Sequence, residues 1–223
     1  MFDITFVSYN EANAEDNWNK LRSRFPIARR VHGVKGIHQA HIAAAKKSYT
    51  EMFWVVDGDS EILDTFDFSD PVGVWIESVY VYKALNPVNN LVYGYSGIKL
   101  LPTEATINMK TDSVDMTTSI VEHFTSVDQI ASIAHFNTDP FSTWRSAFRE
   151  CSKLSSKVID DSYETIERLD TWCNVANGAF ADYAIAGAVA GRKYGEANRN
   201  NLAGLLKIND FEWLKDQFST TQL

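Results

Sequence analysis

The N-terminal part of the chain shows apolar runs separated by amphipathic stretches. Residues 2–8 alternate and then become apolar, and residues 28–34 and 52–57 form two more runs, each typical of a strand. The stretches between them, residues 14–24 and 35–47, repeat apolar or small residues at helical spacing. The pattern therefore predicts the order strand, helix, strand, helix, strand, which is typical of an α/β sheet.

Two further segments predict strands in the middle of the chain. Residues 72–84 alternate apolar and polar side chains, and residues 91–101 form an apolar run that Gly94 and Gly97 interrupt. Glycines inside a strand mark either a bulge or a close approach by another group. The glycines therefore indicate either a bound ligand close to the strand or a bulge with no ligand.

Helices dominate the C-terminal part. Asp139 precedes Pro140, which places a capping side chain before a proline at a first helical position, and apolar residues then recur at helical spacing as far as Cys151. Further helical segments follow over residues 159–170, 177–192 and 202–218. We expect one domain over residues 1–150 and a helical extension over residues 151–223, packed on the same domain.

Composition places the chain among ordinary globular proteins. It has 223 residues, of which 45% are hydrophobic and 22% are charged, and no apolar run approaches the length that spans a bilayer. The net charge of −8 argues against a protein that coats nucleic acid nonspecifically, because that needs a basic surface. Cys151 and Cys173 lack metal-ligand spacing, so we interpret them as buried thiols. We expect a cytoplasmic protein that binds no membrane and needs no obligate protein partner.

The strongest chemical signal is the Asp57-Gly58-Asp59 turn. It follows a strand that is apolar throughout, as strands buried on both faces of a sheet are. Two carboxylates beside a flexible glycine can turn toward one divalent cation, and Mg²⁺ or Mn²⁺ held in this way takes further ligands from phosphates. The other interpretation is a plain polar turn that closes the strand.

Other polar residues follow the neighbouring strands. Residues 8–11 come at the end of the first strand, where ligands of open α/β sheets bind. We therefore expect Ser8, Tyr9, Asn10 and Glu11 to contact the base or ribose of a nucleotide. Lys35 and Gly36 lie between a strand and a helix, where free N–H groups and an ammonium favour a phosphate. A strand-to-helix turn without a ligand is the alternative for both. His38 and His41, three apart on the next helix, have a spacing that metal ligands can have. We interpret them instead as polar positions at the edge of the site, because Asp57 and Asp59 are available to a metal.

These motifs together resemble a known family. A strand with a polar end, a helix, a second strand, an alanine-rich helix and the segment MFWVVDGD over residues 52–59 look like the nucleotide-binding half of GT-A glycosyltransferases. The resemblance implies a Rossmann-like mixed sheet flanked by helices, with a helical C-terminal part. It also implies that Asp57 and Asp59 hold Mn²⁺ or Mg²⁺ on the diphosphate of a nucleotide sugar, usually a UDP-sugar.

The resemblance extends to residues of the C-terminal part. Asp139 matches the carboxylate that inverting GT-A enzymes place at the start of a helix as general base, although capping alone would explain it. His135 would complete the metal shell, as a histidine does in many members. Arg145 and Arg149 could offer guanidinium groups to a phosphate, with Arg145 near the chemistry and Arg149 on the donor, or they could pair on a solvated face.

A narrower likeness concerns the acceptor. The segments RVHGVKGIHQAH and FNTDPFSTWRSAFRE resemble GT-A proteins of tailed phages that are related to the glucosyltransferase making base J in DNA. That likeness implies an acceptor hydroxymethyl group, or a sugar already on it, of a modified pyrimidine in DNA, and a place in the host cytoplasm. An enzyme acting on such a base must extrude and stack it, and Trp144, Tyr93 and Tyr95 are candidates for stacking. The wider GT-A resemblance also implies contacts of Tyr93, Tyr95 and Ser96 to the donor sugar or the acceptor.

Two other hypotheses stay open. The chain could glycosylate an acceptor other than DNA, or it could be a noncatalytic nucleotide-binding or nucleic-acid-binding module. The sugar, the nucleotide, the stereochemical course and the oligomeric state do not follow from the sequence.

Overall fold

A computed structural model describes residues 1–71, 73–95, 97–159 and 162–221. The chain divides into two compact units. The first comprises residues 1–86, 92–111 and 116–135, and the second comprises residues 87–91, 112–115 and 136–223. The division predicted at residue 150 separates a catalytic domain from a helical extension. Compact units do not show which residues act in catalysis, so that division stays a prediction.

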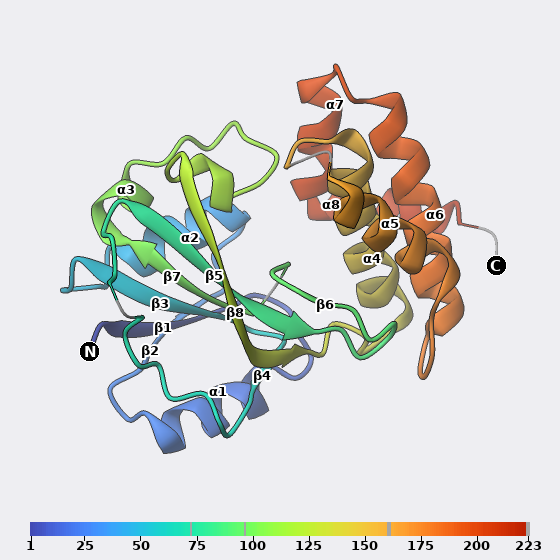
Figure 1. Ribbon diagram of the computed structural model, residues 1–223. Coiled ribbons are helices and arrows are strands. Elements are labelled where there is room, and N and C mark those ends of the chain that lie inside the picture. Colours follow the sequence, from blue (N-terminus) through green and yellow to red (C-terminus); the bar gives the residue numbers. More distant parts are fainter. Residues whose placement is uncertain (72, 96, 160–161, 222–223) are drawn as a thin grey trace. The chain divides into compact units, whose positions relative to one another are not determined.

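The first unit is built on a mixed sheet in the order β2-β1-β3-β7-β5-β8-β4, with β6 paired to β5 (Figure 1). Its strands are β1 (Asp3–Ser8), β2 (Arg29–His32), β3 (Met52–Asp57), β4 (Ser60–Ile62), β5 (Ser78–Leu85), β6 (Val92–Tyr93), β7 (Ile98–Pro102) and β8 (His123–Ala134). Strand β1 is parallel to both β2 and β3, whereas β7 is antiparallel to β3. The predicted N-terminal strands are confirmed in order. Strands β1 and β3 match the predicted bounds to within one residue, whereas β2 is shorter than the predicted 28–34.

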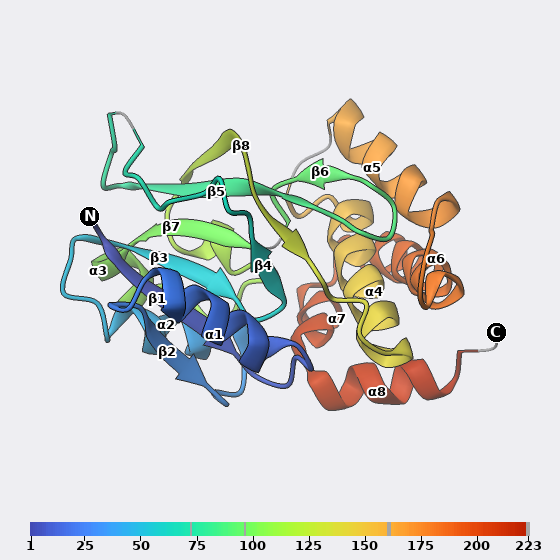
Figure 2. The same ribbon diagram turned by 90° about the horizontal axis from the view of Figure 1, so that it is seen from below.

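Helices cover the two faces of this sheet (Figure 2). Helix α1 (Ala14–Arg24) packs Ala14 and Leu21 on the face that carries Trp54. Helix α2 (Ile37–Ala45) packs its buried alanines on the opposite face, where α3 (Thr103–Ile107) also contributes. Every side chain from Met52 to Val56 is fully buried, so β3 is buried on both faces of the sheet, as its sequence predicted.

The predictions for the middle of the chain hold in part. The strand expected over residues 72–84 is β5, which begins only at Ser78, and position 72 lies outside the described residues. Strand β8 was not predicted, because most of residues 124–130 are exposed and so lack an apolar alternation. A short 3₁₀ helix, η1 (Thr117–Ser119), precedes it. The mixed α/β class with a helical C-terminal part is confirmed and is consistent with a GT-A-like fold.

The second unit is helical. Its elements are α4 (Pro140–Ser156), α5 (Tyr163–Asn174), α6 (Ala181–Ala197), α7 (Leu202–Leu206), η2 (Lys207–Asn209) and α8 (Phe211–Ser219). Trp144 and Phe148 of α4 stack with ring centroids 4.7 Å apart and form its apolar core with Leu205, Ile208 and Leu214. Both cysteines are free and buried, as expected.

Helices α4 and α6 pack with their backbones close together. Gly187, Gly191 and Gly195 lie four residues apart on α6, and a Cβ added at each would meet a backbone oxygen of α4. For Gly191 that oxygen is the carbonyl of Phe148. Small side chains on one face of α6 therefore set the distance between the two helices.

Substitution of Gly191 tests this contact. We expect Gly191→Ala to destabilise the protein by about 1–3 kcal/mol, because overpacking at the helix contact exceeds the gain in helix propensity. The measurement is the urea midpoint of unfolding, with Lys193→Ala on the exposed side of the same helix as control. Equal midpoints for Gly191→Ala and wild type would contradict the close packing.

Candidate active site

The carboxyl ends of three parallel strands meet at one edge of the sheet in the first unit. The pairing places Ser8 of β1 beside His32 of β2, and Val7 beside Asp57 of β3. Ligands of open α/β sheets bind beyond such an edge. Ser8 and Asp57, both predicted from the sequence, are therefore brought together with His32.

The Asp57-Gly58-Asp59 turn lies against the loop that follows β1. A Cβ on Gly58 would be 2.8 Å from Glu11 Oε2 and 3.0 Å from Ser8 Cβ, so a side chain at this position would not fit without a shift. Glu11 Oε2 also accepts a hydrogen bond from the Tyr9 amide at 2.7 Å, and Asn17 Nδ2 donates to the Gly58 carbonyl at 3.1 Å. The glycine is thus needed for close approach, and the two loops hold each other.

Asp57 is partly buried and forms an ion pair with the buried Lys99. Its Oδ2 accepts from Lys99 Nζ at 2.9 Å and from the Gly97 amide at 3.1 Å, and its own amide donates to the Gly97 carbonyl. Burial raises the pKa of Asp57, but the charges of Lys99 and His41 and the hydrogen bonds lower it further, so the pKa lies below its usual range. Asp57 is therefore ionised at neutral pH, with Lys99 as its counter-ion.

His41 of α2 lies close enough to interact with this pair. Its Nδ1 is 2.8 Å from the Ile37 carbonyl and so carries the proton, while its buried Nε2 has no hydrogen-bond partner among the described residues. Burial, helped by the charge of Lys99 and opposed by that of Asp57, lowers the pKa of His41 to about 4. The imidazole is neutral at physiological pH, with an acceptor nitrogen inside the protein.

The remaining residues at the edge form a hydrogen-bond network around Ser8. The buried Ser8 hydroxyl lies 3.0 Å from His32 Nδ1 and accepts from Arg30 Nε at 3.1 Å. Arg30 also pairs with Glu15 at 2.6 Å. Asn10 is exposed, and Tyr9 is partly buried.

The predicted phosphate position before α2 has the expected local geometry. Gly36 directly precedes the helix with φ of 93°, a conformation that favours glycine, and no side chain caps the helix. Lys35 beside it is exposed. The helix start is therefore compatible with the predicted contact to a phosphate, which stays a prediction.

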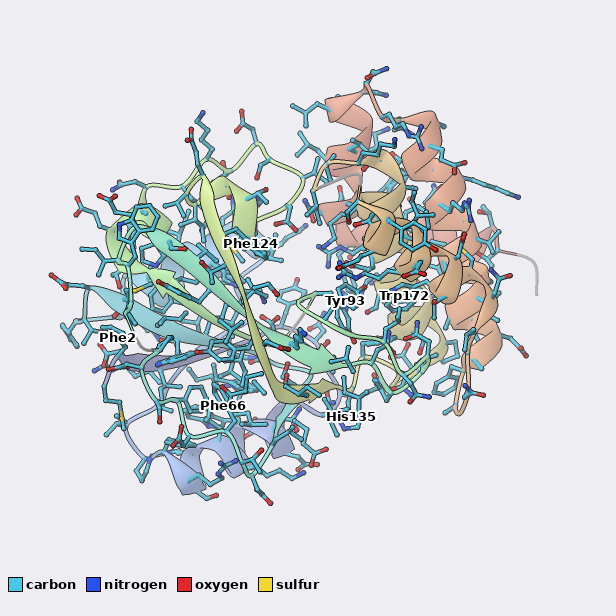
Figure 3. All side chains as sticks on the ribbon, in the orientation of Figure 1. Phe2, Phe66, Tyr93, Phe124, His135 and Trp172 are labelled. Atoms are coloured by element: carbon cyan, nitrogen blue, oxygen red, sulfur yellow. The ribbon has the colours of Figure 1, made fainter. Side chains whose placement is uncertain are left out.

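The three predicted metal ligands do not form one group. His135, labelled in Figure 3, donates its amide to the Asp59 carbonyl at 2.8 Å, so the two residues are neighbours. However, His135 Nε2 lies 2.8 Å from Glu61 Oε2, and the Asp57 carboxylate holds Lys99. Within the described ranges, no cluster of three or more His, Cys, Asp or Glu side chains could hold a metal ion. Because the Asp57 carboxylate and the His135 ring nitrogen already have these partners, the residues fit the expected Mn²⁺ or Mg²⁺ poorly.

Asp139, Arg145 and Arg149 belong to the second unit, and each has a partner there. Asp139 caps α4, with Oδ1 accepting from the Ser142 amide at 2.8 Å. Arg149 donates to the Ile208 carbonyl and to Asn209 Oδ1. The Arg145 guanidinium lies 5.2 Å from the centre of the Phe211 ring. These contacts hold the unit together, and the predicted roles on a ligand stay predictions.

The pKa of Asp139 lies below its usual range. Partial burial raises it, but hydrogen bonds from Ser142 and Thr138 lower it more. An ionised carboxylate is in the right state for a base, although a low pKa makes it a weak one.

The stacking prediction for Trp144 is wrong. The side chain is only 1% exposed, because it fills the core of the second unit against Phe148. Tyr93 and Tyr95 of the first unit stack on one another, with ring centroids 4.7 Å apart, and Tyr93 is buried. Ser96 lies outside the described residues.

Sequence reasoning missed Lys99. It lies within an apolar segment on β7, and only the antiparallel pairing of β7 with β3 brings it to Asp57. The one available signal was a lysine between Ile98 and Leu100, because a charge inside a buried strand needs a partner.

Comparisons with known proteins add little to this picture. No known protein family matches the chain, and no curated protein does either. Among solved structures, a glycosyltransferase involved in the glycosylation of the major capsid of PBCV-1 is similar at 17% identity and a TM-score of 0.30. The match covers 47% of this chain and 62% of that protein, so it spans less than two thirds of its length. At this TM-score the likeness carries no argument about activity.

The lowered pKa of His41 predicts acid sensitivity. Between pH 6.5 and about 4 the unfolded chain binds a proton at His41 that the folded protein does not, so stability falls as the pH falls through this window. The loss attributable to His41 is at most about 3 kcal/mol, at 1.36 kcal/mol for each pKa unit. Urea unfolding at several pH values should show a flatter slope in His41→Gln, with the exposed His32→Gln as control. An unchanged slope in His41→Gln would contradict this burial.

The cap at Asp139 predicts how two substitutions at this position change the stability of the protein. Asp139→Ala should lower the free energy of unfolding by about 1 kcal/mol, because the Ser142 amide loses its acceptor. Asp139→Asn should cost much less, since asparagine caps about as well. Thermal unfolding of the two variants checks this, and equal losses would show that the carboxylate charge matters more than the cap.

Proposed function

We propose that the protein is a glycosyltransferase that binds a nucleotide sugar at the edge formed by β1, β2 and β3. The supporting observation is that Asp57-Gly58-Asp59 ends a buried parallel strand and packs against the loop after the adjacent parallel strand. Ligand binding beyond the carboxyl ends of such strands is general for open α/β sheets. The resemblance of Asp57-Gly58-Asp59 to the Asp-x-Asp motif of GT-A glycosyltransferases supports a nucleotide sugar as the ligand and sugar transfer as the reaction.

The donor in this proposal is a UDP-sugar. Tyr9 and Asn10, after β1, would contact the nucleoside, and the buried Ser8 would fix the end of that strand. Lys35 and the N–H groups at the start of α2 favour its phosphates. The backbone N–H groups and the Lys35 ammonium offset part of the negative charge of a diphosphate.

The proposed acceptor is a hydroxyl group, and most specifically the hydroxymethyl group, or a sugar on it, of a modified pyrimidine in phage DNA. Its support is the sequence likeness of RVHGVKGIHQAH and FNTDPFSTWRSAFRE to tailed-phage proteins. The net charge of −8 counts against a broad DNA surface, so contacts would be local.

The proposed transfer does not depend on the Mn²⁺ or Mg²⁺ expected from the sequence, because the Asp57 carboxylate already binds the Lys99 ammonium. Asp139 stays the candidate base. The pair of variants that tests its cap also tests this role: Asp139→Asn keeps the cap and removes the base, so a base role predicts loss of transfer in both variants.

Donor turnover tests the proposal. Purified protein is incubated with a panel of nucleotide sugars, with and without DNA containing hydroxymethylcytosine or hydroxymethyluracil, and in Mn²⁺, Mg²⁺ or chelator. We expect nucleoside diphosphate release and a hexose or pentose mass on the modified base after digestion. Asp57→Asn should reduce both strongly, because it removes the charge at the centre of the site.

Asp64→Asn is the matched control, since Asp64 is a fully exposed carboxylate of the same unit. Release that DNA does not stimulate would keep the glycosyltransferase and remove the DNA acceptor. No release with any donor, together with nucleotide binding, would favour the noncatalytic binding module.

A further inference from the structure

Lys99 is an unusual residue for its position. It is 7% exposed, on a strand whose other side chains are apolar and buried, and its backbone pairs with Val55 of β3. Lysine is almost never buried to this degree without a partner, and its partner is Asp57. Asp57 is the first residue of the Asp57-Gly58-Asp59 turn, where the Asp-x-Asp motif would hold a divalent cation.

The ion pair and a divalent cation at Asp57 are in competition. Lys99 Nζ lies 2.9 Å from Asp57 Oδ2, and the Gly97 amide donates to the same oxygen. A divalent ion bound to this carboxylate would sit beside a buried ammonium, and like charges repel strongly where water is scarce. His135, which could have added a ligand, has its ring nitrogen at Glu61.

An ammonium could replace a metal here without changing the net charge of the site. A divalent ion between two carboxylates has no net charge left, and it binds phosphate through its remaining coordination positions. Lys99 with Asp57 is also neutral overall. An ammonium has three N–H donors, and in the described part of the chain Asp57 is the hydrogen-bond partner of one.

We propose that Lys99 is the fixed cation of this site: it takes, at Asp57, the place of a divalent ion and donates to the diphosphate of the bound nucleotide. The second half of this statement rests on the proposed function. The first half concerns the ion pair alone. If Lys99 replaces the divalent ion, the nucleotide should bind in the presence of a chelator.

A buried ion pair without a ligand role is the alternative. It predicts that replacing Lys99 lowers stability but leaves nucleotide affinity unchanged. Because Lys99→Met leaves the partly buried Asp57 carboxylate without its counter-ion, the double variant Asp57→Asn/Lys99→Met is included to restore a neutral site. Lys46→Met, at an exposed lysine of the same unit, is the matched control.

The first arm measures Mn²⁺ alone, by electron paramagnetic resonance of the nucleotide-free protein. We expect no measurable Asp57-dependent Mn²⁺ binding in wild type or Lys46→Met. Lys99→Met should bind Mn²⁺ about tenfold or more above the detection limit, and the double variant should lose this binding. Mn²⁺ binding in wild type that Asp57→Asn removes would overturn the proposal.

The second arm measures UDP binding in EDTA by calorimetry. Wild type and Lys46→Met should bind, and Lys99→Met and the double variant should bind about tenfold or more weakly, as expected for loss of a charged hydrogen bond. Equal affinity in wild type and the folded double variant would overturn the phosphate role. Absence of UDP binding in any condition would remove the proposed donor, whereas the Mn²⁺ arm would still decide which cation Asp57 holds.

Discussion

The ion pair between Asp57 and Lys99 constrains the whole carboxyl edge of the sheet. Lys99 is buried and Asp57 is partly buried, so removing either partner leaves a poorly solvated charge and destabilises the protein. The pair joins β3 to β7, and the same carboxylate also binds the Gly97 amide. Gly97 has φ of 89°, a conformation that glycine adopts without strain, so the chain can turn tightly into β7 and present its amide.

The hydrogen bonds at this edge decide which residues are left to meet a ligand. Ser8 has its hydroxyl engaged by His32 and Arg30, and the Tyr9 amide is bound by Glu11. These groups therefore hold the loop in shape, and a nucleotide would gain little from competing with them. The exposed side chains of Asn10 and Lys35 and the backbone at the start of α2 are better placed to contact it. The contribution of Ser8 is then to position the loop.

Local patterns in the sequence were sufficient for the N-terminal half of the sheet. Strand β3 is apolar on both faces, and α1 carries its apolar residues at helical spacing, so both appear where they were expected. Strand β8 has no such signal, because it is largely exposed and its pairing with β5 is irregular. Lys99 was missed for a related reason. Its role depends on the register between β3 and β7, which are distant in sequence, and no local pattern reports that register.

The difference between local and long-range effects also applies to Asp57 and Asp139, the two carboxylates predicted to act at the site. Asp57 and Asp139 both end an extended segment and both have a pKa below the usual range, but the causes differ. Asp139 owes its low pKa to hydrogen bonds from neighbours in the chain, as any capping residue would, so its environment follows from the sequence. Asp57 owes its low pKa to a charge brought from another strand. A cap needs only its own helix, whereas a buried lysine must be positioned by the whole sheet. Its presence therefore indicates a more specialised site at Asp57 than at Asp139.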